Sequence, residues 1–425
     1  MGGALERQSG RHASGYMSAH SILAVSPKIP YPLSDGGALR QFHVLRGYAR
    51  IAAVKLVAFF RDREELKGIE FLRAHGIDLV ALPLTTGADV VTHPGSVWRR
   101  RLQQTASARP LMAEAFRSRE MREAVEREAS AAGLIHACRL WVVPNLERVL
   151  WDRGVKRRFV LDLYDVETIT RSRMLRMTPG PSWRRRLFER LDLLRVKAYQ
   201  AKVLARSTRF FVCSRQDQAR FPGDKAVVIP NGATVPISPL PEEGDGRTIL
   251  AVGLLSYEPN VDALRFFVRE IFPRIRAALP DAHLLVVGRD PTPEVLSLHD
   301  GRTIEVAGSV PSMEPYYRRA TISVVPLRVG GGTRLRILES FAMGRAVVST
   351  GIGCEGLEAV RGEHLLVADE APLFAEACIT LLREPARRHT LAGAARSLVE
   401  QEYTWEAIEK RVAAVAESVL SGGSP

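Results

Sequence analysis

A run of glycines followed by two arginines and a glutamate is the part of the sequence best suited to chemistry. Residues 324–344 read VVPLRVGGGTRLRILESFAMG, so an apolar run stops at Gly330–Gly332 and a helical pattern follows. Glycine lets the backbone approach a ligand without obstruction by a Cβ atom, and the N–H groups of a first helical turn attract anions. The segment therefore predicts a phosphate site at the start of a helix.

The side chains that follow the glycines extend this prediction. Thr333 is a good helix cap, and Arg334 or Arg336 can add charge-assisted hydrogen bonds to a phosphate. Glu339 lies in the second turn, where a carboxylate suits neutral hydroxyls, such as those of a ribose, better than a phosphate. Phosphate and sugar hydroxyls together describe a nucleotide. The alternative is structural: the glycines only make a turn, and Arg336 pairs with Glu339 three residues later.

A second glycine pair follows the first expected strand. Gly36 and Gly37 come just before a helical pattern, so their N–H groups would face an anionic or oxyanionic group. The alternative is an ordinary turn with Asp35 as the helix cap. A third pattern, GIGCEG at 351–356, lacks the helix and the acidic residue of a dinucleotide site, and no GxxxxGK[ST] sequence occurs.

Apolar runs alternate with amphipathic helical stretches, and these elements must position the glycine loops. Strands are expected at 21–26, 51–60, 77–84, 134–137, 158–164, 208–214, 226–230, 248–253, 283–288, 303–308, 322–327, 346–350 and 364–368. Several runs are apolar throughout, as in parallel strands buried on both faces. The pattern predicts two Rossmann-like α/β domains with ligands at the carboxyl ends of their strands.

Composition sets the expected domain boundaries. Residues 1–19 read as a disordered leader, 20–235 as the N-terminal domain, 236–246 as a linker and 247–402 as the C-terminal domain. The linker is rich in proline, glycine and acidic residues and has no periodicity. Residues 403–425 contain a last amphipathic helix, which could pack on either domain.

The segment VVPLRVGGGTRLRILESFAMGRAVVSTGIGCEGLEAV resembles the donor-binding segment of glycosyltransferase family 4 enzymes, in particular bacterial enzymes of polysaccharide and exopolysaccharide assembly. The segments SDGGALRQF, VIPNGA and LLVVGRDP add to the resemblance, which covers roughly residues 21–415. It implies the GT-B fold, in which two Rossmann-like domains face each other across a cleft. The N-terminal domain would then take the acceptor and the C-terminal domain the nucleotide-sugar, and the last helix would cross back onto the first domain.

The resemblance also implies an activity and site residues. The reaction would be a retaining, metal-independent transfer of a hexose from a nucleotide-sugar to an acceptor hydroxyl, without a cofactor. Gly331, Gly332 and Thr333 would line the phosphate or sugar site. Glu339 matches the second glutamate of the family's E-x7-E motif, which holds the ribose. The pair Gly36–Gly37 matches the loop that closes over donor and acceptor.

The sequence departs from the family pattern at the donor side. The first glutamate of E-x7-E would fall at Gly331, and the family's arginine and lysine align near Leu254 and Asn260, so neither cation is present. We therefore expect Arg334 and Arg336 to supply positive charge to the donor phosphates.

The catalytic and acceptor-side residues are expected at the ends of N-terminal strands. Where the family often has a histidine, this chain reads Tyr164-Asp165, and Asp165 is a candidate base. His136 is a third catalytic candidate, with a hydrogen-bonded core histidine as the alternative. Arg40 and His43 could approach the acceptor from the helix after the glycine pair, or could lie on an ordinary helix surface.

The net charge of +13 is unevenly spread, since residues 171–209 contain twelve Lys or Arg and only two acidic residues. Apolar residues at helical spacing accompany these cations, which fits either a solvated helix or one on anionic lipid headgroups. No nucleic-acid motif accompanies them, so no nucleic-acid partner is expected. With scattered cysteines and no signal peptide, the chain is expected in the cytoplasm, at the inner face of the cell membrane.

The sequence thus predicts a glycosyltransferase with a nucleotide-sugar donor, a glycan, lipid-linked or small-molecule acceptor, and no metal. It would build a surface or exported glycan. Two other readings stay open. One is a donor-binding GT-B protein with altered catalysis, and the other is a basic Rossmann-type protein that binds nucleic acid.

Overall fold

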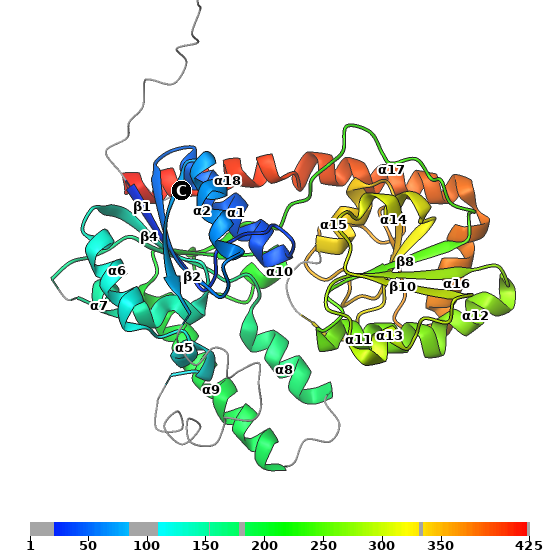
Figure 1. The fold of residues 1–425 in the computed structure, drawn as a ribbon, viewed down its shortest axis with the longest axis horizontal. Helices are drawn as coiled ribbons and strands as arrows, with labels where there is room; N and C mark the ends of the chain where they lie inside the picture. The colour runs from blue at the N-terminus through cyan, green and yellow to red at the C-terminus, as the bar shows by residue number, and fades with distance from the viewer. Residues whose placement is uncertain (1–20, 85–108, 153, 178–182, 331–334, 423–425) are drawn as a thin grey trace, which may run out of the picture.

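The computed structural model describes residues 21–84, 109–152, 154–177, 183–330 and 335–422. These residues form two α/β domains side by side, each built on one parallel sheet with helices on its faces (Figure 1). Each apolar run expected to be a strand contains one, so the predicted fold class is correct. The expected leader lies outside the described residues.

The N-terminal domain contains a seven-stranded sheet in the order β3-β2-β1-β4-β5-β6-β7. Its elements are β1 (Ser21–Ser26), α1 (Gly36–Ala49), β2 (Ala53–Phe60), α2 (Gly68–Ala74), β3 (Ile77–Pro83), α5 (Leu111–Ala115), α6 (Arg119–Ala129), β4 (Ala132–Ala137), α7 (Glu147–Leu150), β5 (Phe159–Asp162), α8 (Glu167–Met177), α9 (Trp183–Arg206), β6 (Arg209–Val212), α10 (Arg215–Gln218) and β7 (Ala226–Val228). Because β1 lies between β2 and β4, the strand order reverses there and opens a crevice at the carboxyl ends of these strands.

The C-terminal domain repeats the plan with a six-stranded sheet in the order β10-β9-β8-β11-β12-β13. Its elements are β8 (Thr248–Val252), α11 (Glu258–Phe266), α12 (Phe272–Ala278), β9 (His283–Val287), α13 (Pro293–Leu296), β10 (Ile304–Gly308), α14 (Glu314–Arg319), β11 (Ile322–Val325), α15 (Leu335–Ala342), β12 (Ala346–Ser349), β13 (Leu366–Val367), α16 (Ala371–Arg383) and α17 (Pro385–Glu402). The strand order reverses between β8 and β11, so the second crevice lies there.

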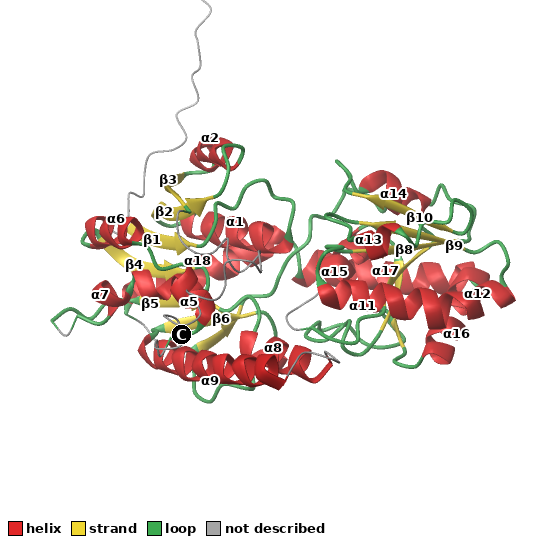
Figure 2. Cartoon of the chain, turned by 60° about the horizontal axis from the view of Figure 1, so that its bottom comes forward, coloured by secondary structure: helices red, strands yellow, loops and turns green. Residues whose placement is uncertain are grey.

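The last helix, α18 (Trp405–Ser421), leaves the C-terminal domain and packs along α1 of the N-terminal domain (Figures 1 and 2). The two helices approach closely at Gly47, where an added Cβ atom would lie 2.8 Å from the Cβ of Val412. Ile408, Val412 and Ala416 complete the apolar layer over this face of the first sheet.

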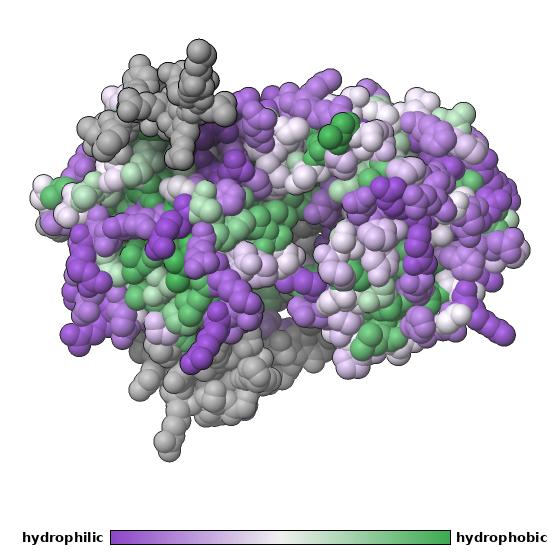
Figure 3. Space-filling view, turned by 45° about the horizontal axis from the view of Figure 1, so that its top comes forward, coloured by the Kyte–Doolittle hydropathy of each residue, from purple (hydrophilic) through white to green (hydrophobic). Residues whose placement is uncertain are grey.

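The segment expected as a linker lies against the C-terminal domain rather than free between the domains. Buried Arg345 donates hydrogen bonds to the carbonyls of Leu240 and Pro241, at 3.0 and 2.7 Å, and Arg396 donates to Pro236. These contacts hold an aperiodic stretch in place through its backbone. On the face shown in Figure 3, polar side chains dominate, and apolar side chains gather mainly on the half of the view with the N-terminal domain.

Candidate active site

The two glycine segments singled out in the sequence come together across the boundary between the domains. A Cβ atom added to Gly36, the first residue of α1, would lie 2.2 Å from Cδ1 of Leu335, the first described residue of α15. The crevices of the two sheets therefore face each other at this point. Gly331, Gly332, Thr333 and Arg334 lie outside the described residues, so their predicted roles stay predictions.

The loop before α1 is fixed by charged contacts from both domains. Asp35 caps the helix by accepting a hydrogen bond from the N–H of Ala38 at 2.9 Å, and Lys28 Nζ lies 2.5 Å from its other oxygen. Burial raises the pKa of Asp35, but the Lys28 ammonium and these hydrogen bonds outweigh it and lower the pKa. Arg289, which follows β9, donates to Ser34 Oγ at 3.0 Å. The glycine pair thus begins a helix whose position depends on the C-terminal domain.

Arg336 on α15 lies where the family resemblance left two cations missing. Its Nη2 donates to Asn260 Oδ1 at 3.0 Å, and a Cβ atom added to Gly253 would lie 3.0 Å from its Nη1. Asn260 in turn donates to the carbonyl of Leu254 at 2.8 Å. The guanidinium therefore lies beside Leu254 and Asn260, the two positions that align with the family's arginine and lysine. These residues line a cavity at the carboxyl ends of β8 and β11.

Glu339 lies one turn after Arg336 on the same helix. Its side chain makes no hydrogen bond with any residue that the structure describes, so Arg336 bonds to Asn260 and not to Glu339. Burial raises the pKa of Glu339 to about 7, while the nearby Arg336 charge acts in the opposite direction. A carboxylate that is desolvated without hydrogen-bond donors is poised to accept them from a ligand.

Tyr164 connects the end of β5 to the glycine loop. Its hydroxyl donates to the carbonyl of Gly37 at 3.0 Å, and the Arg139 guanidinium lies 4.2 Å from the centre of its ring. Both residues line a cavity of about 300 Å³ in the N-terminal domain. Its walls combine apolar Met112, Phe116 and Trp141 with the cations Lys28, Arg61, Arg139 and Arg171. This cavity lies on the predicted acceptor side.

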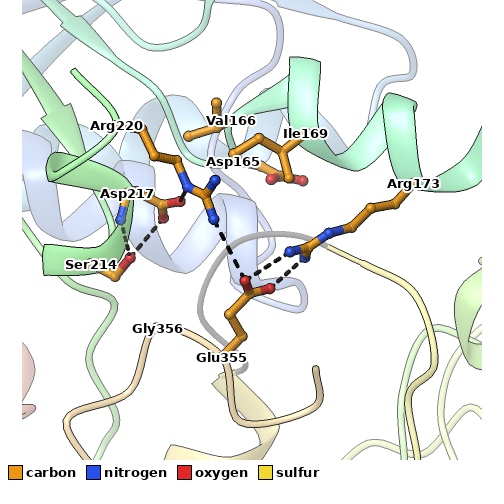
Figure 4. A pocket seen from close by; sticks show the side chains of 9 residues that line it. All are labelled: Asp165, Val166, Ile169, Arg173, Ser214, Asp217, Arg220, Glu355 and Gly356. Carbon is orange, nitrogen blue, oxygen red and sulfur yellow. Dashed lines mark hydrogen bonds and ion pairs between the residues drawn. The ribbon is translucent and has the colours of Figure 1, made fainter. Parts of the chain in front are cut away.

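Asp165, the candidate base, faces a second and smaller cavity at the domain boundary (Figure 4). Both of its carboxylate oxygens lie 2.8 Å from Thr170 Oγ1 on α8. Arg173, Ser214 and Asp217 from the N-terminal domain line the same cavity with Glu355 from the other domain. The structure thus places Asp165 on the boundary, next to side chains that bind each other.

Arg173 and Glu355 make the most extensive charged contact between the domains that we find in the described chain. Arg173 Nη2 donates to Glu355 Oε1 at 2.8 Å, and Nη1 donates both to Oε2 and, at 2.7 Å, to the carbonyl of Gly330. Gln216 also donates to Glu355 at 3.0 Å. The GIGCEG stretch, which was set aside as a dinucleotide site, is therefore a contact surface for the other domain.

His136 is not a catalytic residue of this site. It is 1% exposed, and its Nδ1 lies 2.9 Å from the hydroxyl of Tyr48. Burial lowers the pKa of His136 to about 3, with a smaller effect from the Arg40 charge. The alternative of a hydrogen-bonded core histidine is the correct one.

Arg40 and His43 are not on the acceptor side either. Arg40 is 1% exposed and donates to both oxygens of Asp162, with the shortest contact at 2.8 Å, and to the carbonyl of Ile229 at 2.7 Å. His43 is stacked on Trp405 of α18, with ring centres 4.2 Å apart, and its Nδ1 lies 2.7 Å from Glu409. Both residues face inward because α1 is covered by the sheet and by α18.

Three functional candidates were missed in the sequence. Arg289 was visible in the motif LLVVGRDP, and Arg139 follows a strand end, so both could have been found by looking for cations after strands. Glu355 gave no such signal because its partners come from the other domain. Among the described residues, no group of three or more His, Cys, Asp or Glu is arranged to hold a metal ion, and no helix is long and apolar enough to cross a membrane.

Comparison with known proteins agrees with this geometry. Residues 246–384 match the family model described as "Glycosyl transferases group 1", so the C-terminal domain is a glycosyltransferase family domain. A protein of Klebsiella pneumoniae, described as an uncharacterized 44.6 kDa protein in the cps region, is 27% identical over 164 residues. The match covers 36% of this chain and 42% of that protein.

Solved structures extend the likeness to both domains. Sucrose-phosphate synthase from Thermosynechococcus elongatus has a TM-score of 0.67 at 17% identity, covering 95% of this chain and 100% of that one. HepE of Anabaena, solved with UDP and glucose, has a TM-score of 0.62 at 12% identity, covering 93% and 99%. TarM has a TM-score of 0.65 at 8% identity, covering 95% and 99%. The fold is that of the GT-B glycosyltransferases, as the sequence predicted.

Proposed function

We propose that this protein is a glycosyltransferase that moves a hexose from a nucleotide-sugar to an acceptor hydroxyl. The nucleotide would bind the C-terminal domain between β8, β11 and α15. The family domain at 246–384 supports this side of the proposal, as does the likeness to HepE, which was solved with UDP and glucose. The cavity of the N-terminal domain would take the acceptor.

The observation that carries the proposal is the pair of Arg336 and Glu339 on one face of α15. Arg336 places a guanidinium at the carboxyl end of β8, next to Gly253, where the backbone leaves room for a phosphate. Glu339 offers an acceptor with a raised pKa one turn further along. A nucleoside diphosphate has the matching groups in this order: phosphate oxygens for the cation and ribose hydroxyls for the carboxylate.

The same groups would favour transfer. Negative charge grows on the diphosphate as the sugar leaves, and Arg336 together with the start of α15 would stabilise that charge without a metal ion. Configuration at the sugar carbon would be retained, as the family resemblance implies. Tyr164 would position the Gly36–Gly37 loop through its hydrogen bond to Gly37, and Asp165 is the proposed base.

Nucleotide binding to Arg336 is the direct test. Titration calorimetry with UDP, GDP and ADP is expected to show affinity for one of them, and Arg336→Ala should weaken that affinity by about tenfold or more, since a charge-assisted hydrogen bond is lost. Arg269→Ala removes an exposed arginine on neighbouring α11 and should change nothing. Equal affinities for Arg336→Ala and the native protein would exclude the proposed donor site.

A second candidate is a donor-binding protein with altered catalysis, because glycine stands at 331 where the family pattern has a glutamate. The two candidates differ in turnover. Release of free nucleotide from a nucleotide-sugar, with or without an acceptor, would rule out the second candidate. Tight binding without release in the presence of cell-envelope glycan extracts would favour it.

The biological setting is also a proposal. The relative in a cps region supports a role in the synthesis of a surface or exported polysaccharide. Such acceptors are assembled next to the cell membrane, and the basic helices of the N-terminal domain would hold the enzyme at its cytoplasmic face.

A further inference from the structure

Helix α9 carries an apolar stripe on its outer surface. Trp183, Leu187, Leu191 and Leu194 have exposed fractions of 70, 50, 47 and 60%. Their spacing of four, four and three residues places them on one face of the helix. In Figure 2, α9 runs along the outside of the N-terminal domain, next to α8. Large apolar side chains gathered on one exposed face mark an interaction site more often than scattered ones do.

The orientation of the stripe is fixed by the opposite face of α9. Val196 and Val203 are buried in the domain core. Asp192 is 5% exposed, accepts a hydrogen bond from the N–H of Leu111 at 3.0 Å, and receives another from Arg171 Nη1 at 2.7 Å. The helix therefore cannot roll to bury the stripe without breaking these contacts.

Cations border the stripe on both sides. Five exposed residues of the helix carry positive charge: Arg184, Arg186, Arg190, Lys197 and Lys202. Of the two acidic residues in α9, Asp192 is buried and Glu189 points away from the stripe by its helical position. An apolar face bordered by arginine and lysine is the pattern of a helix that lies in the headgroup layer of an anionic membrane.

We infer that the face of α9 formed by Trp183, Leu187, Leu191 and Leu194 docks the protein on an anionic lipid bilayer. This deepens the proposed function by naming the surface that meets the membrane. The charge pattern favours lipid over a second copy of this chain, because two such faces would bring like charges together. It favours lipid over nucleic acid, because four large apolar side chains occupy the centre of the face.

The docked position has a consequence for the acceptor cavity. Arg171, which Asp192 of α9 holds at 2.7 Å, is also part of the wall of the N-terminal cavity. The membrane-facing helix and the proposed acceptor site therefore share one ion pair. This arrangement would bring the cavity close to acceptors that are themselves anchored in the bilayer.

Vesicle binding tests the docking surface without any sugar donor, so its failure is distinguishable from failure of the proposed activity. The full-length protein is expected to sediment with vesicles of phosphatidylcholine and phosphatidylglycerol and only weakly with phosphatidylcholine alone. The double variant Leu187→Glu/Leu194→Glu should lower the partition coefficient by about a hundredfold, as expected for two buried leucines. The control Leu296→Glu/Leu373→Glu changes two equally exposed leucines, at 50 and 54%, in the other domain and should bind as the native protein does.

Further measurements protect the test from trivial outcomes. The melting temperature of the double variant should match that of the control, which excludes unfolding. Trp183 should show a blue shift and quenching by brominated lipid, and both signals should disappear in Trp183→Phe. Undiminished vesicle binding by the double variant would overturn the inference. So would a dimer of the native protein that the double variant abolishes in the absence of vesicle binding.

Discussion

Arg173 of the N-terminal domain binds Glu355 of the C-terminal domain through both guanidinium Nη atoms. The same side chain holds the carbonyl of Gly330, the residue directly before the glycine stretch proposed to bind phosphate. The arginine thus connects the separation of the domains to the start of the donor site. This relationship, and three others in the structure, lead to measurable expectations.

Removal of the Arg173 side chain should loosen the domain arrangement more than it lowers stability. Arg173→Ala is expected to increase the radius of gyration in small-angle X-ray scattering. It should lower the free energy of unfolding by only about 0–1 kcal/mol, because the ion pair is partly exposed. Arg119→Ala breaks an exposed pair within α6 and should leave the scattering unchanged. Native scattering from Arg173→Ala would mean that contacts such as Arg289 with Ser34 are sufficient.

The raised pKa of Glu339 predicts a pH-dependent cost to stability. Between its usual value near 4.5 and about 7, the folded state keeps a proton that the unfolded state has lost, so ionisation destabilises the fold as pH rises. Glu339→Gln should therefore be more stable than the native protein at pH 8, by about 1–3 kcal/mol, and equal to it at pH 4.

Urea denaturation at the two pH values measures this difference, with Glu417→Gln on exposed α18 as the control. The same Glu339→Gln protein should bind nucleotide more weakly, since an amide is a poorer acceptor for ribose hydroxyls. A stabilised variant that binds nucleotide as well as the native protein would contradict the ribose role. A variant with no stability gain at pH 8 would contradict the pKa.

The lowered pKa of His136 predicts the opposite pH dependence. The unfolded chain takes up a proton near pH 6.5, while the folded state resists until about pH 3, so stability falls as the solution is acidified through this range. Two-dimensional NMR of imidazole nitrogens should show His136 neutral at pH 5. A protonated His136 at that pH would disprove the buried assignment.

The buried pair of Arg40 and Asp162 predicts a large effect on stability. Arg40→Ala leaves a buried carboxylate without its partner and should cost about 3–5 kcal/mol, measured by urea denaturation. Arg46→Ala, on the exposed side of the same helix, should cost less than 1 kcal/mol by the usual worth of exposed pairs, about 0–1 kcal/mol. Arg40→Ala/Asp162→Leu should recover part of the loss. Similar costs for both arginines would show that Asp162 is reached by water.

The sequence was informative wherever a local pattern determines structure. Strands buried on both faces are apolar throughout, so all of them were visible as runs. Asp35 could be identified as a helix cap, and Arg336 as a cation next to the glycines, because each acts on groups a few residues away. The position of Arg336 beside Asn260 also agrees with the expectation that it replaces a missing cation.

The sequence was uninformative wherever the partner of a residue lies far along the chain. His43 looked like a surface residue of α1, because Glu409, which covers it, follows 366 residues later. Arg40 looked able to reach an acceptor for the same reason, since Asp162 and Ile229 surround its guanidinium. Glu355 lacked meaning without Arg173. Periodicity identifies the buried face of a helix, but it does not say which distant segment covers the other faces.

The return of α18 to the N-terminal domain has a consequence for biosynthesis. The layer over α1 needs Trp405, Ile408 and Val412, which a ribosome adds only after the entire C-terminal domain. During translation, the N-terminal domain must therefore wait with the apolar side of α1 uncovered while the second domain emerges and folds. The domain that comes first in the sequence is completed last, so nascent chains stalled before residue 404 should depend on chaperones much more than the full-length protein does.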